Sequence, residues 1–177
     1  MPVTRIAGLA LVFALAWAVV MTGQGPADAK LQSQLKALFP DASAFSPKEG
    51  NPPHYKVYVP DGRGGRRVGG YAFWTTELVP LERAYDGPIK ILVGMDTVGI
   101  LAGAIVTEHR EPYGNFSVDT AGFVNQFKGK NIRDGFKYGE DVDAISRATI
   151  SVTSASRAIR NSARRVAREY LTPEAGK

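Results

Sequence analysis

The sequence contains no cysteine and only two histidines, His54 and His109. The absence of cysteine excludes disulfides, cysteine-ligated zinc, iron–sulfur clusters and thiol nucleophiles. Two histidines leave little for a metal site or a c-type haem, so any redox chemistry has to be carried by an organic cofactor. Internal repeats and low-complexity tracts are also absent. The 177 residues provide for one domain with a sizeable core and hardly for two.

The longest hydrophobic run lies at the N-terminus. Arg5 precedes an almost unbroken apolar stretch over residues 6–21, and Ala27-Asp28-Ala29 resembles an A-x-A cleavage site. This order is typical of a bacterial secretory signal peptide. The run is shorter than the ~20 residues that usually span a bilayer, which favours cleavage over an uncleaved anchor in the inner membrane. We therefore expect a signal peptide over residues 1–29 and a periplasmic domain over residues 30–177.

The chain carries a net charge of +5 at pH 7, and all of this charge belongs to the part after residue 29. A basic balance is typical of proteins that bind nucleic acid, acidic partners or membrane surfaces. Because the N-terminal segment indicates export, we expect no nucleic-acid partner. An acidic electron-transfer partner or an anionic phosphate group fits better.

Apolar periodicity predicts an α+β fold. Residues 31–39 have apolar side chains at helical spacing, and Pro40 ends the pattern. Four segments rich in β-forming residues follow, over residues 55–59, 68–76, 89–93 and 100–107. Short turns between them predict a twisted antiparallel sheet with helices packed against it. A short helix is expected over residues 120–127, and a loop over residues 131–142.

The glycine-rich stretch over residues 62–70 invites a comparison with phosphate-binding loops. It lacks the Lys-[Ser/Thr] ending of such a loop and does not open a helix. A hairpin turn between two strands is therefore the favoured interpretation.

The last predicted element is a long amphipathic helix. Its apolar face is made by Ala155, Ile159, Ala163, Val166 and Tyr170, and its opposite face by Arg157, Arg160, Arg164 and Arg168. The arginines are either a solvated face, which is favoured, or a docking surface for an acidic partner or lipid headgroups.

Hydroxyl side chains cluster where this helix begins, namely Ser146, Thr149, Ser151 and Thr153. Composition alone favours N-terminal capping, in which side-chain oxygens accept bonds from free backbone N–H groups. The same N–H groups and the helix dipole also favour a bound phosphate.

The segment Asp143-Ala-Ile-Ser-Arg-Ala-Thr149 resembles the D-x-x-[ST]-G-A-T acceptor sequence of the FMN-binding domain family. Asp143, Ser146, Ala148 and Thr149 match position by position, and Arg147 replaces the usual glycine. The family includes the C subunit of sodium-translocating NADH:quinone reductase and the G subunit of its Rnf-type relative. It also includes the N-terminal domain of the membrane regulator of nitrous oxide reduction, which residues 70–80 and 87–96 resemble most.

A second segment supports the resemblance. Residues 99–108, followed by His109-Arg-Glu-Pro-Tyr113, are similar to the strand and turn that border the flavin in these domains. Each side chain here also has a structural interpretation. For His109, a hydrogen-bonded strand-end role is favoured over a proton relay. Glu111 accepts a bond from flavin or pairs with an arginine, and Tyr113 stacks on the flavin ring or belongs to an ordinary turn.

The resemblance implies an exported electron-transfer flavoprotein. A flavin transferase would attach FMN to Thr149 through a phosphoester, and electrons would pass to a periplasmic or membrane-bound redox partner, for example in nitrous oxide reduction. No catalytic or metal-binding residues of its own are implied. The alternatives are a flavin-free sensor or assembly module and an N-terminal piece of a larger membrane-bound regulator. The expected cofactor-binding residues are Thr149, Asp143, Ser146, Ala148, Ile150, His109, Glu111 and Tyr113.

Overall fold

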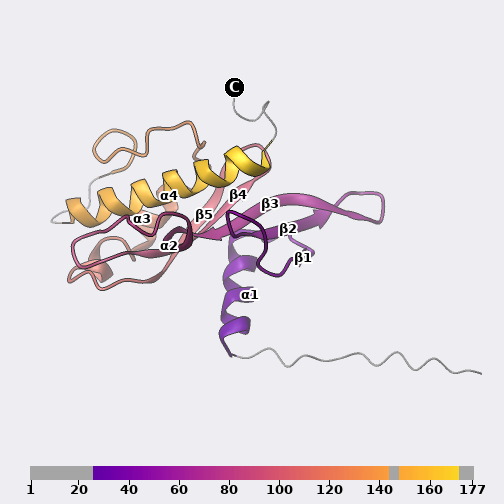
Figure 1. The fold of residues 1–177 in the computed structure, drawn as a ribbon, viewed down its shortest axis with the longest axis horizontal. Helices are drawn as coiled ribbons and strands as arrows, with labels where there is room; N and C mark the ends of the chain where they lie inside the picture. The colour runs from indigo at the N-terminus through magenta and orange to yellow at the C-terminus, as the bar shows by residue number, and fades with distance from the viewer. Residues whose placement is uncertain (1–25, 144–147, 172–177) are drawn as a thin grey trace, which may run out of the picture.

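A computed structural model describes residues 26–143 and 148–171. These residues form an α+β fold with one antiparallel five-stranded sheet in the order β1-β2-β3-β4-β5 (Figure 1). The predicted fold class is therefore confirmed. The apolar run over residues 6–21 lies outside the described residues. Within them, no helix is both long enough and apolar enough to cross a membrane.

From residue 26 onward, the N-terminal half contributes one helix and three strands, α1 (Pro26–Leu38), β1 (Ala44–Phe45), β2 (Tyr55–Pro60) and β3 (Arg66–Trp74). The sequence did not indicate β1, which has only two residues and pairs with β2 at the edge of the sheet. β2 and β3 form the expected hairpin, and the Asp61 carboxylate accepts bonds from two backbone N–H groups of its turn. The hairpin interpretation of the glycine-rich stretch is thus confirmed.

The second predicted segment, residues 68–76, is too long at its C-terminal end. β3 stops at Trp74, and the chain continues as the short helix α2 (Thr75–Leu78). The cause is the buried hydroxyl of Thr75, which donates to the Ile89 carbonyl and accepts a bond from the Ile91 N–H, at 3.1 Å each. The Thr75 hydroxyl thus takes the place of the backbone hydrogen bonds that would otherwise continue the pairing of β3 with β4.

The C-terminal half completes the sheet with β4 (Lys90–Asp96) and β5 (Leu101–Glu108). The short helices η1 (Gly114–Phe116), α3 (Ala121–Val124) and η2 (Asn125–Phe127) follow, and then the long helix α4 (Thr149–Tyr170). Thr120 caps α3 by accepting a bond from the Phe123 N–H. Residues 131–142 contain no helix or strand, so the predicted helix and loop are both confirmed.

The sheet is covered by helices on both faces (Figure 1). Alternate residues of β3 and β4, such as Phe73 and Val93, pack with the apolar face of α4 in the main core. Their neighbours Ala72 and Leu92 point the other way and pack with Leu35 of α1 in a smaller cluster. The period of two along the strands therefore places α4 and α1 on opposite faces.

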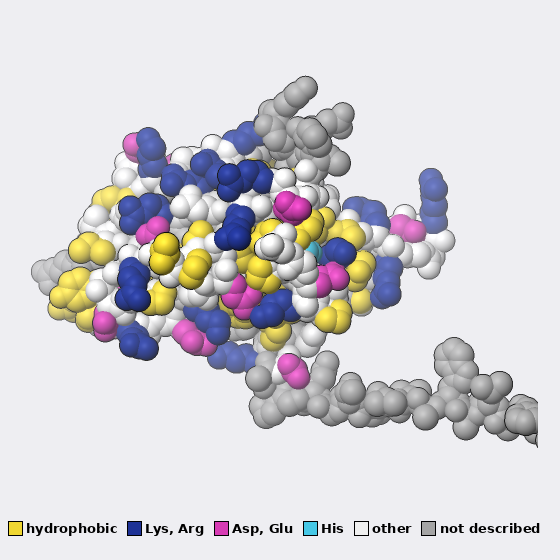
Figure 2. Space-filling view, in the orientation of Figure 1, with side chains coloured by type: hydrophobic (Ala, Val, Ile, Leu, Met, Phe, Trp, Pro, Cys, Tyr) yellow, Lys and Arg dark blue, Asp and Glu magenta, His cyan; other side chains and the backbone are white. Residues whose placement is uncertain are grey.

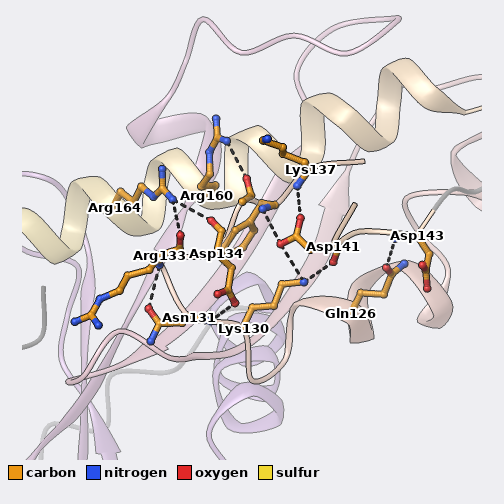
Figure 3. A network of polar contacts seen from close by, with 12 residues as sticks. Gln126, Lys130, Asn131, Arg133, Asp134, Lys137, Asp141, Asp143, Arg160 and Arg164 are labelled. Atoms are coloured by element: carbon orange, nitrogen blue, oxygen red, sulfur yellow. Dashed lines mark hydrogen bonds and ion pairs between the residues drawn. The ribbon is translucent and has the colours of Figure 1, made fainter. Parts of the chain in front are cut away.

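The apolar face of α4 is confirmed, and the arginine face is only in part the expected solvated surface, because Arg157 and Arg168 are exposed but Arg160 and Arg164 are half-buried. Arg160 donates to the Gly135 carbonyl at 2.9 Å, and Arg164 donates to the carbonyls of Ile132 and Asp134 at 2.7 and 2.9 Å (Figure 3). Arg157 pairs with Glu82 at 2.9 Å. Burial, followed by the neighbouring Arg160 charge, lowers the pKa of Arg164. These arginines fasten two loops to α4.

Candidate functional site

A pocket of about 470 Å³ lies where α4 begins. Three segments that are distant in the sequence meet there: the turn after α2, the turn after β5, and the first turn of α4. This size is within the range of small-molecule and cofactor sites. The lining residues are Tyr85, Glu111, Pro112, Tyr113, Ala148, Thr149, Ile150 and Ser151.

Glu111 joins these three segments. Its carboxylate accepts bonds from the N–H groups of Tyr85 at 3.3 Å and Asp86 at 2.8 Å, and the Ser151 hydroxyl donates to it as well. The side chain is only 6% exposed. Both carboxylate oxygens therefore bond protein groups, namely two backbone N–H groups and a hydroxyl. An arginine, one of the two partners expected for Glu111, is not among these groups. Glu111 therefore holds the three segments that line the pocket together.

The rim of the pocket is apolar and exposed. Tyr85, Tyr113 and Ile150 are 70%, 64% and 58% exposed, although large hydrophobic side chains are usually buried. Figure 2 shows hydrophobic side chains gathered at the left end of the molecule, where α4 begins. Two aromatic rings and a branched aliphatic side chain around an open pocket suit a flat, partly apolar ligand.

Thr149 is the first residue of α4, and its side chain is exposed at this pocket. Its hydroxyl donates to the Tyr138 hydroxyl at 3.3 Å. The N-cap residue is Ala148, which has no side-chain oxygen, and the Ser151 hydroxyl bonds Glu111 instead of the backbone. The capping interpretation is therefore wrong for Thr149 and Ser151. By helix geometry, the N–H groups of the first turn have no acceptor within the helix.

The rest of the acceptor segment is only partly described. Ser146 and Arg147 lie outside the described residues. Asp143 is exposed and does not line the pocket; its N–H donates to the Gln126 side chain at 2.6 Å (Figure 3). The structure thus brings Ala148, Thr149 and Ile150 together with the turn that carries Glu111 and Tyr113.

His109 does not line this pocket. Its ring packs on Gly114, and its Nε2 atom lies 3.9 Å from an Asp119 carboxylate oxygen. Nδ1 is buried and has no hydrogen-bond partner within the described part of the chain. His109 instead borders a separate hollow of about 600 Å³, together with Thr76, Glu77, Pro88, Lys90, Glu108 and Arg110.

The loop over residues 131–142 supplies Tyr138 to the site. Asp141 organises this loop by accepting the N–H groups of Phe136 at 2.9 Å and Lys137 at 2.5 Å (Figure 3). Burial raises the pKa of the Asp141 carboxyl, but these two bonds and the Lys130 charge outweigh burial and leave the pKa below its ordinary value. The carboxylate form therefore stabilises the loop.

Sequence reasoning missed three contributors to the site: Tyr85, Ser151 as a partner of Glu111, and Tyr138. Tyr85 and Tyr138 come from irregular segments with no periodicity. Ser151 was assigned to capping. Its position two residues after the acceptor threonine was the only available signal, and helix geometry alone does not reveal which loop carboxylate it meets.

Residues 84–164 match the family model of the FMN-binding domain. That stretch contains every residue that lines the pocket. The chain is also similar to the G subunit of the ion-translocating oxidoreductase complex of Vibrio vulnificus (strain YJ016), with 32% identity over 87 residues. The alignment covers 44% of this chain and 41% of that relative. The resemblance to the FMN-binding domain family is thereby confirmed, and FMN is the cofactor that it supports.

Proposed function

We propose that this protein is an exported electron-transfer domain that carries FMN esterified to Thr149. The observation that carries the proposal is the position of the Thr149 hydroxyl. It is exposed, it lies at the end of a long helix, and it borders an open pocket with an aromatic rim. An acceptor hydroxyl has to be reachable by the transferase, and the attached group then has to find a binding surface beside it.

The first turn of α4 suits the phosphate of FMN. The free N–H groups and the positive end of the dipole of a 22-residue helix favour the negatively charged phosphodiester at this position. Ala148 leaves these groups without a competing side-chain oxygen at the N-cap. The phosphate would therefore satisfy N–H groups that capping residues satisfy in most helices.

The rim suits the flavin ring. Tyr85 and Tyr113 provide aromatic surface, Ile150 provides apolar surface, and the buried Glu111 keeps the two turns at a fixed separation. When bound, FMN supplies one- and two-electron chemistry, and the protein supplies binding and orientation. His109 and Asp143 remain expected flavin-site residues from the resemblance, and both lie off the pocket lining.

The partners and the compartment follow from the sequence and the relative. The apolar run over residues 6–21 supports export to the periplasm, with an inner-membrane tether as the alternative. The relative is named as a subunit of an oxidoreductase complex, which supports a membrane-associated redox partner. Participation in nitrous oxide reduction rests on the sequence resemblance alone.

The transfer reaction belongs to a separate flavin transferase. The Thr149 oxygen would attack the FMN phosphorus of FAD, forming the O–P ester bond. The P–O bond to the AMP phosphate would break, AMP would leave, and the hydroxyl proton would pass to a base of the transferase. On this account Thr149 is the residue of this chain that takes part in the transfer reaction.

The test is the intact mass of the mature protein after co-expression with a flavin transferase in the periplasm. We expect a gain of one FMN less one water in wild type and in Thr153→Val, and no gain in Thr149→Val. Thr153 is the matched control, because it lies one turn further along α4. Unmodified wild-type protein, or equal loading of Thr149→Val, would favour a flavin-free sensor or assembly module.

A further inference from the structure

We propose that Tyr138 positions the Thr149 hydroxyl for modification and afterwards donates a hydrogen bond to the resulting phosphoester. This inference rests on the proposed function and extends it to a residue outside the acceptor segment. Tyr138 lies eleven residues before Thr149 and does not line the pocket, yet its hydroxyl accepts the hydrogen bond that the acceptor hydroxyl donates.

The hydrogen bond restricts a side chain that would otherwise rotate. Threonine in a helix divides between two χ1 rotamers, and an exposed hydroxyl has water as an alternative partner. The 3.3 Å bond from the Thr149 hydroxyl to Tyr138 favours one of these rotamers. Holding a reacting atom in one orientation removes part of the entropic cost of the reaction.

Tyr138 is itself held in place from several directions. Its ring is half-buried and packs against the main core, so mainly the hydroxyl end is available to Thr149. A backbone bridge pairs Tyr138 with Val142, and the Gly139 N–H donates to the Val142 carbonyl at 2.9 Å. The phenol therefore reaches the acceptor from a defined position.

The same loop is fastened to the helix that carries the acceptor. Arg160 and Arg164 of α4 bond carbonyls of the loop, and the Asp141 carboxylate bonds its backbone N–H groups (Figure 3). The loop that carries Tyr138 is thus bonded to the helix that carries Thr149 at residues 132–135 as well as at the Tyr138 contact itself. This shared support gives the arginine face of α4 a role in the site, although the pocket lining within the described residues includes no arginine of α4.

One phenol serves both states of the threonine. Before transfer, the Thr149 hydroxyl donates its proton toward the Tyr138 oxygen, which leaves the lone pairs of the threonine oxygen for attack on phosphorus. After transfer, that oxygen is an ester oxygen without a proton. The Tyr138 O–H can rotate and donate to the ester oxygen or to a phosphate oxygen. Phenylalanine at this position would keep the ring but could neither accept the bond from Thr149 nor donate one to the phosphoester.

The test compares Tyr138→Phe with Tyr58→Phe, a matched change on strand β2. Purified unmodified protein is incubated with FAD, Mg²⁺ and a flavin transferase, and FMN incorporation is followed by intact mass. We expect kcat for the Tyr138→Phe acceptor to fall about tenfold, the effect of one lost hydrogen bond of about 1.4 kcal/mol, while KM stays near wild type. Tyr58→Phe should react at the wild-type rate.

A second measurement separates positioning from a merely structural effect. The ³¹P chemical shift of the loaded protein should change in Tyr138→Phe and not in Tyr58→Phe, since only the former removes a donor from the phosphoester. Wild-type loading with unchanged kcat and unchanged ³¹P shift in Tyr138→Phe would overturn the role of Tyr138. Absence of loading in wild type itself would instead overturn the proposed function.

Discussion

Replacing Glu111 by alanine removes the acceptor that joins the turn at Tyr85 and Asp86 to the first turn of α4. Two backbone N–H groups and the Ser151 hydroxyl lose their partner at once. At about 1 kcal/mol net for each of three bonds, the free energy of unfolding should fall by about 3 kcal/mol. For a domain of this size, that corresponds to a decrease in Tm of about 6–12 °C.

Thermal and urea unfolding measure the effect, and Glu77→Ala is the matched control. Glu77 also pairs through its carboxylate, with Lys48 at 2.8 Å, but both side chains are partly exposed, so its loss should cost less than about 1 kcal/mol. A double-mutant cycle with Ser151→Ala should give a coupling energy of about 1 kcal/mol. Glu111→Ala protein that melts within about 2 °C of Glu77→Ala would refute the assignment of Glu111 as the joint between the segments.

Two further substitutions test the surroundings of the site. The pKa of Asp141 is lowered in the folded state, so its contribution to stability is complete above its unfolded pKa of about 3.9 and is lost as the pH falls through the folded value. Asp141→Asn should therefore unfold more easily than wild type at pH 7, and urea titrations should show the difference shrinking below about pH 4. Gly114→Ala places a methyl group in direct overlap with the His109 ring and should cost about 1–3 kcal/mol. Gly122→Ala, whose nearest neighbour is 3.9 Å away, should be neutral or slightly stabilising by the same assay, and equal effects of the two would contradict the packing of His109 on Gly114.

Local patterns predicted the elements whose cause is local. The periods of two and 3.6 predicted β2, β4, β5 and the buried face of α4. The turn at Asp61 was predictable because its hydrogen bonds form between its own residues. The end of β3 could not be predicted in this way. Thr75 leaves the strand because its hydroxyl bonds residues fourteen and sixteen positions away, and no periodicity reports such a contact.

In the site, too, residues within local motifs were predicted and residues placed by distant contacts were not. The family motif singled out Thr149, and the turn after β5 singled out Glu111 and Tyr113, which the pocket then brings together. Tyr85 and Tyr138 were beyond sequence reasoning because they act through loops whose positions are set by tertiary bonds. The arginines of α4 were predicted as a stripe, but the partners of Arg160 and Arg164 are backbone carbonyls, which every residue has and which no sequence pattern singles out.

These contacts make α4 the element that organises the site. Its first turn carries Thr149, and Ser151 bonds the carboxylate that holds the turn at Tyr85 and Asp86. Further along the helix, Arg157 holds Glu82, and two other arginines hold the loop that carries Tyr138. Because the opposite face of α4 is buried in the main core, both loops are bonded to a helix that is itself packed against the sheet. A site built on a packed helix keeps its geometry better than one built on loops alone. A covalently attached group needs that fixed geometry only at its point of attachment, which here is Thr149.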